Sequence, residues 1–540
     1  MHEDRKQDGR ATPPASPKTS VKLASFLILL SSPFILLWLL DRSFSFAHWH
    51  INPDYFPSER EVLVRQNVMP ARFSDDEKAF IDEIKSSKIK VAIFGGSSAA
   101  GFAAPVGLAR FLEEAAPDRL VIHNYAEGGA PFVGFQEELA KIVMPYYDVI
   151  ILYAGHNEVW SYLYKGSREL NEGISLPWGQ NVEYGAVDFR HSLKMMQLKR
   201  LFNDDVLNGD LSFFNRVRTT FWGSIYNISL NSRLAYFIKS LGTKVIGSAN
   251  LLASGSEKTG EKRLPFFEKT PFIGDEAKQR FVDGYMNSVS EIKNKLHPGQ
   301  KLIISTVLSN DLFPPLLDAV DEKASLPDAE SRAASLYAAV GTPGLKPADA
   351  STLPGSAHKA YLNAAFCLGG ISPTSLEHRI EGKCIDFARN ARSADTFPTR
   401  VLPSINDFIR SSMTKEQNVY VIDPERRLNE QRTEADYLDF FVDFQHPSSF
   451  GHMNIANEIV PLLLPHQEIT FAQKDACDTF AVRDSQGERQ IAPRKGMLES
   501  QVQTNLKWLD LFSKRASNAF MYEFYKNRAQ DKLRRCAAAG

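Results

Sequence analysis

The stretch KVAIFGGSSAAGF, residues 90–102, leads from an apolar run straight into a pair of serines flanked by glycines. The run 90–94 shows no alternation of apolar and polar residues, which is typical of a strand buried on both faces. We expect the turn after it to hold the Ser97 hydroxyl over a sheet edge, with the Ser97 N–H at a helix N-terminus that favours negative charge. A glycine-rich turn that only caps a helix or cradles phosphate is the alternative.

Four more apolar runs have the same character, namely LVIHN (120–124), DVIILY (148–153), KLIISTV (301–307) and NVYVID (418–423). Helical patterns separate the early runs, and another, SDDEKAFIDEIKSS (74–87), precedes the first and opens with a serine N-cap followed by acids. Strands that alternate with helices predict an α/β fold with a central parallel sheet. Ligands bind such sheets at the carboxyl ends of the strands, so we expect the chemistry in the segments that follow them.

One such segment is YAGHNE, residues 153–158. At the end of a buried strand, the Asn157 side-chain amide can donate a hydrogen bond to a carbonyl oxygen in the cleft. Its alternative role is to cap the helix that follows. His156, beside the turn, is expected to be a surface or packing residue.

A carboxylate precedes a histidine by three residues in DFQHPSSFGH, residues 443–452. At this spacing Asp443 can accept the N–H of the His446 imidazole and fix its tautomer, as nucleophilic catalysis requires. Pro447 stiffens the turn, and the helical pattern that begins at residue 450 anchors it. His452 is expected on the surface of that helix.

The composition is that of a globular protein, with 43% hydrophobic and 24% charged residues, and argues against long-range disorder. The formal net charge is −1, so no basic excess is present to hold a polyanion, and nucleic acid is not expected as a partner. The four cysteines form no CxxC pair and no Cys/His spacing suited to zinc. Two disulfides and four buried thiols are both compatible with this count.

Together these segments resemble the SGNH (GDSL-like) hydrolase family, which has a serine, a glycine, an asparagine and a D-x-x-H in four successive blocks. The matching residues are Ser97 and Gly101 in GGSSAAG, Gly129 or else Gly128 in NYAEGGA, Asn157 in AGHNE, and Asp443 with His446 in DFQHPSSFG. All four blocks occur in the family order. There are two departures: Gly96 stands where the family has an acidic residue, and Glu158 where it has aspartate.

The resemblance implies a flavodoxin-like three-layer α/β/α sandwich and a serine esterase that acts on O-acyl esters without metal or cofactor. Ser97 would be the nucleophile, His446 its base and Asp443 the carboxylate that orients the base. The N–H groups of Ser97 and Gly129 and the Asn157 amide would form the oxyanion hole. The substrate would be an acylated small molecule, lipid or glycan. The alternatives are O-acyl transfer to an envelope polysaccharide, or a catalytically silent, membrane-tethered binding or scaffold module.

The match is strongest to a bacterial subgroup with tetratricopeptide-like helices, and it covers residues 88–158 and 301–465. In this subgroup a helical insertion runs into a segment like ARSADTFPTRVLPSINDFIR (391–410). There, Arg400 and Asn406 would either contact the substrate or brace the structure.

The N-terminus predicts a membrane anchor. Residues 23–40 are an uncharged apolar run just long enough to cross the hydrocarbon core as a helix. Basic residues are frequent in the polar stub 1–22, which we expect to be disordered in the cytoplasm, and fewer follow in the stalk 41–73. This asymmetry predicts a single-pass membrane protein with its catalytic domain on the extracytoplasmic side. A cleaved signal peptide is the alternative.

The rest of the chain divides into a core and its insertions. The expected segments are a first half of the core (74–158), an aromatic-rich insertion with a return helix (159–300), a core strand and loop (301–328), a helical hairpin insertion (329–395), a second half of the core (396–465) and a C-terminal extension (466–540). Cys367 and Cys384 fall on neighbouring parts of the helical insertion, so they are the favoured disulfide pair. The same insertion could hold protein partners.

Residues 497–535 of the extension predict one long amphipathic helix. Trp508 and its apolar neighbours are expected to pack back on the domain. Binding of this helix to a membrane surface is the alternative.

Overall fold

The computed structural model describes residues 77–158, 274–315, 356–367, 382–396, 398–412, 417–430, 438–494, 496–513 and 520–539, with short pieces within 36–43, 195–202, 232–234 and 328–335. The predicted stub 1–22, nearly all of the stalk 41–73, and most of 23–40 and of 159–273 lie outside these residues. Among the described residues, no helix combines the length and the apolar character needed to cross a bilayer. Two compact units divide the chain, and the larger, Glu61–Asn227 with Thr243–Gly540, contains both sheets.

All five predicted strands are present and form one parallel sheet in the order β2-β1-β3-β4-β5. The strands are β1 (Ile89–Gly95), β2 (Leu120–Asn124), β3 (Val149–Tyr153), β4 (Lys301–Ser305) and β5 (Val419–Ile422). In the central strands, residues that point to either face are buried, as the lack of alternation predicts. The α/β class with a central parallel sheet is therefore confirmed.

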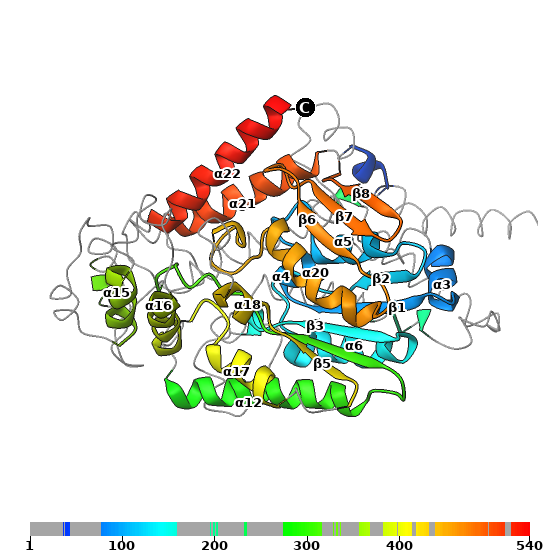
Figure 1. Ribbon diagram of the computed structural model, residues 1–540, viewed down its shortest axis with the longest axis horizontal. Helices are drawn as coiled ribbons and strands as arrows, with labels where there is room; N and C mark the ends of the chain where they lie inside the picture. Colours follow the sequence, from blue (N-terminus) through cyan, green and yellow to red (C-terminus); the bar gives the residue numbers. More distant parts are fainter. Residues whose placement is uncertain are drawn as a thin grey trace, which may run out of the picture. The chain divides into compact units, whose positions relative to one another are not determined.

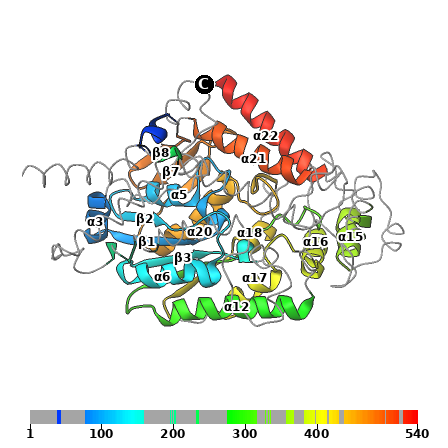
Figure 2. The ribbon, with the colours of Figure 1, turned by 180° about the vertical axis from the view of Figure 1, so that it is seen from behind.

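Helices cover both faces of this sheet (Figure 1, Figure 2). On one face α5 (Leu108–Ala115) and α20 (Ser449–Leu463) pack on each other, and on the other face α6 (Glu137–Val143) and α12 (Asp275–Asn294) do the same. The spacing of apolar residues explains this, since α5 buries one stripe at intervals of three and four residues: Leu108, Phe111, Leu112 and Ala115. Shorter elements are α3 (Glu77–Lys85), α4 (Ser97–Ala100), the π-helical turn η2 (Phe132–Gln136) and the 3₁₀ turn η3 (Met144–Tyr146).

The helical insertion contains a hairpin of α15 (Ser356–Cys367) and α16 (Gly382–Ala394), and a disulfide joins Cys367 to Cys384. After it, α17 (Pro403–Ser412) precedes β5 and α18 (Pro424–Glu430) follows it. Arg392 of α16 is buried and pairs with Asp311, which follows β4, and with Glu425 of α18. This ion cluster ties the insertion to the sheet.

The C-terminal extension contains a second sheet that the sequence analysis did not predict. Strands β6 (Thr470–Gln473), β7 (Phe480–Asp484) and β8 (Gly487–Ile491) pair antiparallel in that order. Phe471 and Phe480 pack their rings on Phe111 of α5, with ring centroids 5.3 and 4.9 Å away. The small sheet therefore lies on the outer side of the helical layer.

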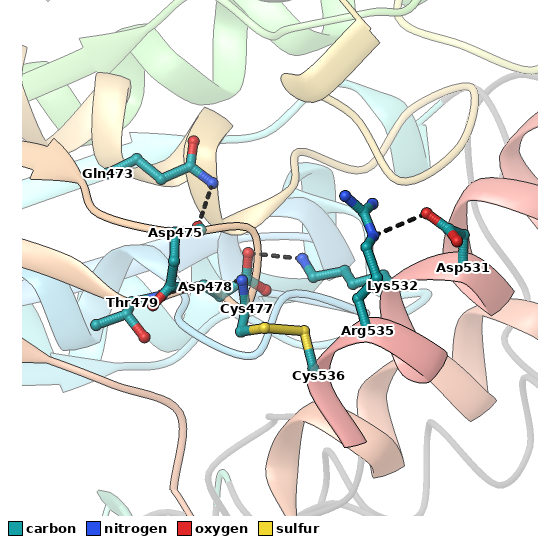
Figure 3. Close-up of a disulfide and its surroundings, with 9 residues drawn as sticks. All are labelled: Gln473, Asp475, Cys477, Asp478, Thr479, Asp531, Lys532, Arg535 and Cys536. Atoms are coloured by element: carbon teal, nitrogen blue, oxygen red, sulfur yellow. Dashed lines mark hydrogen bonds and ion pairs between the residues drawn. A yellow bond between two sulfur atoms is a disulfide. The ribbon is translucent and has the colours of Figure 1, made fainter. Parts of the chain in front are cut away.

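Two helices end the chain, so the prediction of a single helix over 497–535 is wrong. They are α21 (Met497–Ser513) and α22 (Phe520–Ala539), which pack against each other and are called the C-terminal hairpin below. A second disulfide joins Cys477, between β6 and β7, to Cys536 near the end of α22 (Figure 3).

Candidate active site

A sharp turn at the end of β1 presents Ser97. Gly95, the last residue of β1, has φ +153°, and a Cβ on it would fall 2.0 Å from the carbonyl oxygen of Tyr153. The Gln136 side chain donates to Gly95 O at 2.6 Å and accepts from Gly95 N at 2.7 Å. Ser97 then begins α4, which ends at Gly101 with φ +82°. Glycine is required at both ends because one end is crowded and both have positive φ.

Ser97, His446 and Asp443 form one chain of hydrogen bonds. Ser97 Oγ lies 2.7 Å from His446 Nε2, and His446 Nδ1 lies 2.6 Å from Asp443 Oδ2. The carboxylate holds the imidazole proton on Nδ1, which leaves the Nε2 lone pair to accept the serine proton. The three side chains are 7, 2 and 0% exposed, so little water competes for these bonds. The structure thus brings together the three residues predicted to be catalytic.

The loop that carries the histidine and its carboxylate is held by its own backbone. The N–H groups of Gln445 and His446 both donate to Asp443 Oδ1, at 2.8 Å each. Val442 N donates to His446 O at 3.0 Å, which closes the loop, and the Ser448 hydroxyl caps α20 directly after it. Two backbone N–H groups therefore fix the Asp443 carboxylate through Oδ1, while its Oδ2 binds the imidazole.

The two remaining blocks meet beside the nucleophile. A Cβ on Gly128 would lie 3.9 Å from the Ser97 Cβ, so the turn that contains Gly128 and Gly129 passes next to the serine. Gly129 has φ +76°, a left-handed conformation that favours glycine. The Asn157 side-chain amide donates to the Ala130 carbonyl oxygen at 3.0 Å. The predicted oxyanion residues Gly129 and Asn157 therefore belong to one hydrogen-bonded unit beside Ser97.

Glu158 holds the same turn from the residue after Asn157. Its Oε1 accepts a hydrogen bond from the Phe132 N–H at 2.6 Å, and the side chain is 2% exposed. Burial raises the pKa of the Glu158 carboxyl to about 7, although hydrogen bonds from backbone N–H groups act to lower it. Glu158, which stands where the SGNH family has aspartate, thus links the glycine turn to the segment that carries Asn157.

The other two histidines of these segments are buried and cannot serve as a second base. His156 Nε2 donates to Leu308 O at 2.8 Å, and its Nδ1 accepts from Val401 N at 3.0 Å. Burial lowers the pKa of His156 to about 3, so the ring is neutral near pH 7. The expectation that His452 lies on a helix surface is wrong: it is 0% exposed, and burial lowers its pKa to about 3.

Arg400 and Asn406 both make bracing contacts to the backbone. Arg400 is 2% exposed and donates to Asn310 O at 2.6 Å. Asn406 is 0% exposed and binds both backbone groups of Val307, accepting at 2.8 Å and donating at 2.9 Å.

Asn310 is a supporting residue that the sequence analysis missed. Its Nδ2 donates to the Asp443 carbonyl at 3.2 Å and to the Tyr525 hydroxyl at 2.7 Å. Its own N–H donates to Phe444 O at 3.2 Å. Asn310 follows β4 at the same sheet edge at which Asn157 follows β3, and this position is the signal that could have identified it.

Aromatic rings complete the surroundings of the imidazole. The ring centroid of Phe102, just after the nucleophile turn, lies 4.4 Å from that of His446. Trp508 of α21 lies 6.2 Å from the same ring, edge to face. The sequence predicts that Trp508 packs on the domain, with binding of its helix to a membrane surface as the alternative, and nothing in the pattern indicates a contact with His446.

A cavity of about 270 Å³ lies between the C-terminal hairpin and the backbone of the catalytic loop, and its lining includes none of Ser97, His446 and Asp443. Within the part of the chain that the structure describes, no group of three His, Cys, Asp or Glu side chains is placed to hold a metal ion. The hydrogen bonds from Ser97 to His446 and from His446 to Asp443 offer a hydroxyl nucleophile and its base. Comparisons with protein-family models, with curated proteins and with solved structures find no match to this chain.

Proposed function

We propose that this protein is a serine ester hydrolase of the SGNH type, acting on O-acyl esters through an acyl-enzyme on Ser97. One observation carries the proposal: Ser97 Oγ, His446 and Asp443 are linked by hydrogen bonds of 2.7 and 2.6 Å. Ser97 and His446 are 349 positions apart in the sequence, so only the fold brings them together, whereas Asp443 and His446 are 3 positions apart in one loop. A buried serine aligned on a carboxylate-bound imidazole is the arrangement that nucleophilic catalysis needs.

Acylation follows from this geometry. His446 Nε2 takes the Ser97 proton as Oγ bonds to the ester carbonyl carbon, and Asp443 offsets the imidazolium charge. The Ser97 and Gly129 N–H groups and the Asn157 amide stabilise the oxyanion. His446 then returns the proton to the alkoxide, and the alcohol leaves with the acyl group still on Ser97. In the second half, His446 takes a proton from water as the water oxygen attacks the acyl carbon. His446 then gives that proton to Ser97 Oγ as the acid is released.

The proposal includes a flavodoxin-like architecture and an extracytoplasmic location for the catalytic domain. The strand order 2-1-3-4-5 with helices on both faces is the flavodoxin-like one, as in a three-layer SGNH domain. The disulfides Cys367–Cys384 and Cys477–Cys536 favour an oxidising compartment outside the cytosol. Together with the apolar run 23–40, they favour a single-pass anchor with an extracytoplasmic catalytic domain. An acylated small molecule, lipid or glycan is the substrate class we propose, and the helical insertion is available to protein partners.

Acyl transfer to a sugar hydroxyl of an envelope polysaccharide is the second candidate. The low exposure of Ser97 and His446, 7 and 2%, favours it, because an acyl-enzyme shielded from water survives until another acceptor arrives. The case for a catalytically silent module rested on Gly96, which replaces an acid. That case is weakened, since the Asn157 amide occupies the space beside Gly96.

Labelling with a fluorophosphonate probe tests the nucleophile. The full chain in detergent should label once, on Ser97, and Ser97→Ala should abolish labelling. Ser98→Ala is the matched control, because this neighbouring serine donates to the Gln445 carbonyl and should not react. Labelling of wild type that survives Ser97→Ala, or no labelling of folded wild type, would remove the enzyme assignment.

Turnover on a panel of short-chain and long-chain esters, with and without an added glycan, separates hydrolysis from transfer. Hydrolysis predicts release of free acid at a rate that the glycan does not change. Transfer predicts acylated glycan and little free acid.

A further inference from the structure

The C-terminal hairpin reaches across the catalytic residues, outside the segments that carry the SGNH resemblance. We infer that Trp508 of α21 is a positioning residue for the His446 imidazole, and that the C-terminal hairpin thereby completes the active site. The inference rests on the proposed function, because it gives Trp508 a role only if His446 acts as a base. The C-terminal extension would then take part in catalysis through Trp508 as well as packing on the domain.

Trp508 contacts both catalytic segments at once. Its ring centroid lies 5.9 Å from that of Phe102, which follows the nucleophile turn, and 6.4 Å from that of Phe444, between Asp443 and His446. The His446 ring itself is 6.2 Å away, at an interplanar angle of 71°. Edge-to-face and offset arrangements of this kind are the favoured geometries of aromatic pairs. Trp508 therefore contacts both the segment after Ser97 and the loop of His446, whose relative position determines whether the Ser97 proton can pass to the imidazole.

The hydrogen bonds of His446 leave one motion that ring contacts can restrict. Bonds to Asp443 at Nδ1 and to Ser97 at Nε2 fix the two nitrogens, but the ring can still rock about the line that joins them. Phe102, at 4.4 Å, packs against the imidazole, and Trp508 packs against both. Without the indole, both Phe102 and the imidazole gain room, and the serine proton loses its aligned acceptor.

Polar contacts fix the hairpin on the catalytic loop. Asn505 Nδ2, one turn before Trp508, donates to the Val442 carbonyl at 3.1 Å. On α22, the Tyr525 hydroxyl accepts from Asn310 at 2.7 Å and donates to Leu438 O at 3.3 Å. The indole is thus held in place by neighbours that themselves contact the loop of Asp443 and His446.

The far end of α22 is fixed covalently. Figure 3 shows the Cys477–Cys536 disulfide beside the ion pair of Lys532 with Asp478, at 2.6 Å. Of the two disulfides, this is the one that links the hairpin to the rest of the described fold. The hairpin that carries Trp508 is thus held by hydrogen bonds to the loop of Asp443 and His446 and by a disulfide near the end of α22.

The test compares Trp508→Ala with Trp508→Phe in the full chain. Trp508→Ala should lower kcat and the rate of fluorophosphonate labelling about 10- to 100-fold, as expected for a misplaced catalytic group, and change KM less than about threefold. Trp508→Phe keeps a ring at this position and should recover most of both rates. Phe524→Ala on α22 is the matched control, since this half-buried ring contacts Tyr525 and Arg528 and should change neither rate.

The outcomes are distinguishable. If folded wild type is not labelled at Ser97, the proposed function fails and this inference falls with it. If wild type is labelled and Trp508→Ala, with a native melting temperature, is labelled equally fast, only the inference is overturned. If Trp508→Ala does not fold, Trp508→Phe and Trp508→Leu decide: a folded Leu variant that is as active as the Phe variant overturns the inference, and a lower kcat at equal KM in the Leu variant alone supports it.

Discussion

Gly96 and Asn157 occupy complementary space: a Cβ placed on Gly96 would fall 2.0 Å from the Asn157 Nδ2. The absence of a side chain at residue 96 is therefore what allows the Asn157 amide to lie against the nucleophile turn. The SGNH family, which the sequence resembles, has an acidic residue at this position, so the departure here accompanies a packing in which the asparagine lies against residue 96. It does not by itself indicate a lost activity.

Gly96→Ala should damage activity much more than stability. The backbone of Gly96 is extended, with φ −86°, which alanine adopts readily, and the clashing atoms, Nδ2 and Cγ, belong to the Asn157 side chain, which can swing away. Once the Asn157 amide moves, one oxyanion donor is lost, so kcat should fall about 100-fold. Steady-state kinetics and a thermal melt on the same preparation measure both effects. A melting temperature that falls along with the rate would contradict this account.

Asn157→Ala should lower kcat by about 10²–10³-fold and leave fluorophosphonate labelling detectable, because the nucleophile and base remain. Since Gly96→Ala acts through the same amide, the double variant should lose no more than Asn157→Ala alone. Additive losses in kcat would mean that the two residues act independently.

The sheet and the residues of the candidate site are predictable from the sequence because their signals are local. Each strand is a short apolar run without alternation, and the catalytic groups follow strands or precede a helix. In a parallel sheet, such positions converge at one edge whatever lies between them in the chain. This is why the sequence alone predicts that residues as distant as Ser97 and His446 lie close together.

The C-terminal extension was not predictable for the opposite reason. Strands β6 and β8 are short and largely exposed, and β8 (GERQI) is mostly polar, so neither shows the pattern of a buried strand. The interval between α21 and α22 contains no glycine or proline to mark the end of a helix. The roles of Arg400 and Asn310 depend on which backbone group lies opposite, which is a tertiary property.

Arg392→Met should destabilise the fold by about 3–5 kcal/mol, because it removes the ion pair of the buried Asp311, while Glu425 keeps its ion pair with Arg410. Replacing Asp311 as well, in Arg392→Met/Asp311→Leu, should restore part of the loss by removing one stranded carboxylate. Urea denaturation of the two variants measures the difference. Equal losses in the single and double variants would argue against the ion cluster as the tie between insertion and sheet.

Glu158 should make stability depend on pH in a window set by its own titration. Burial raises its pKa in the folded protein from the ordinary 4.5 to about 7, so between these values the folded state binds more protons than the unfolded state. Stability from the neutral carboxyl is therefore fully present below pH 4.5 and is lost as the pH rises through about 7. The loss is on the order of 3 kcal/mol.

Glu158→Gln resembles the neutral carboxyl and does not titrate, so it should match wild type near pH 4.5 and become the more stable protein above pH 7. Urea denaturation at several pH values gives the difference in unfolding free energy between the two, in which all other titrating groups cancel. Glu138→Gln, at an exposed glutamate of α6, controls for the loss of a carboxylate. Curves for wild type and Glu158→Gln that stay parallel from pH 4.5 to 8 would show that Glu158 titrates in the folded protein as it does in the unfolded chain, so that it is ionised near pH 7. The turn that carries Gly129 would then be held by a charged residue.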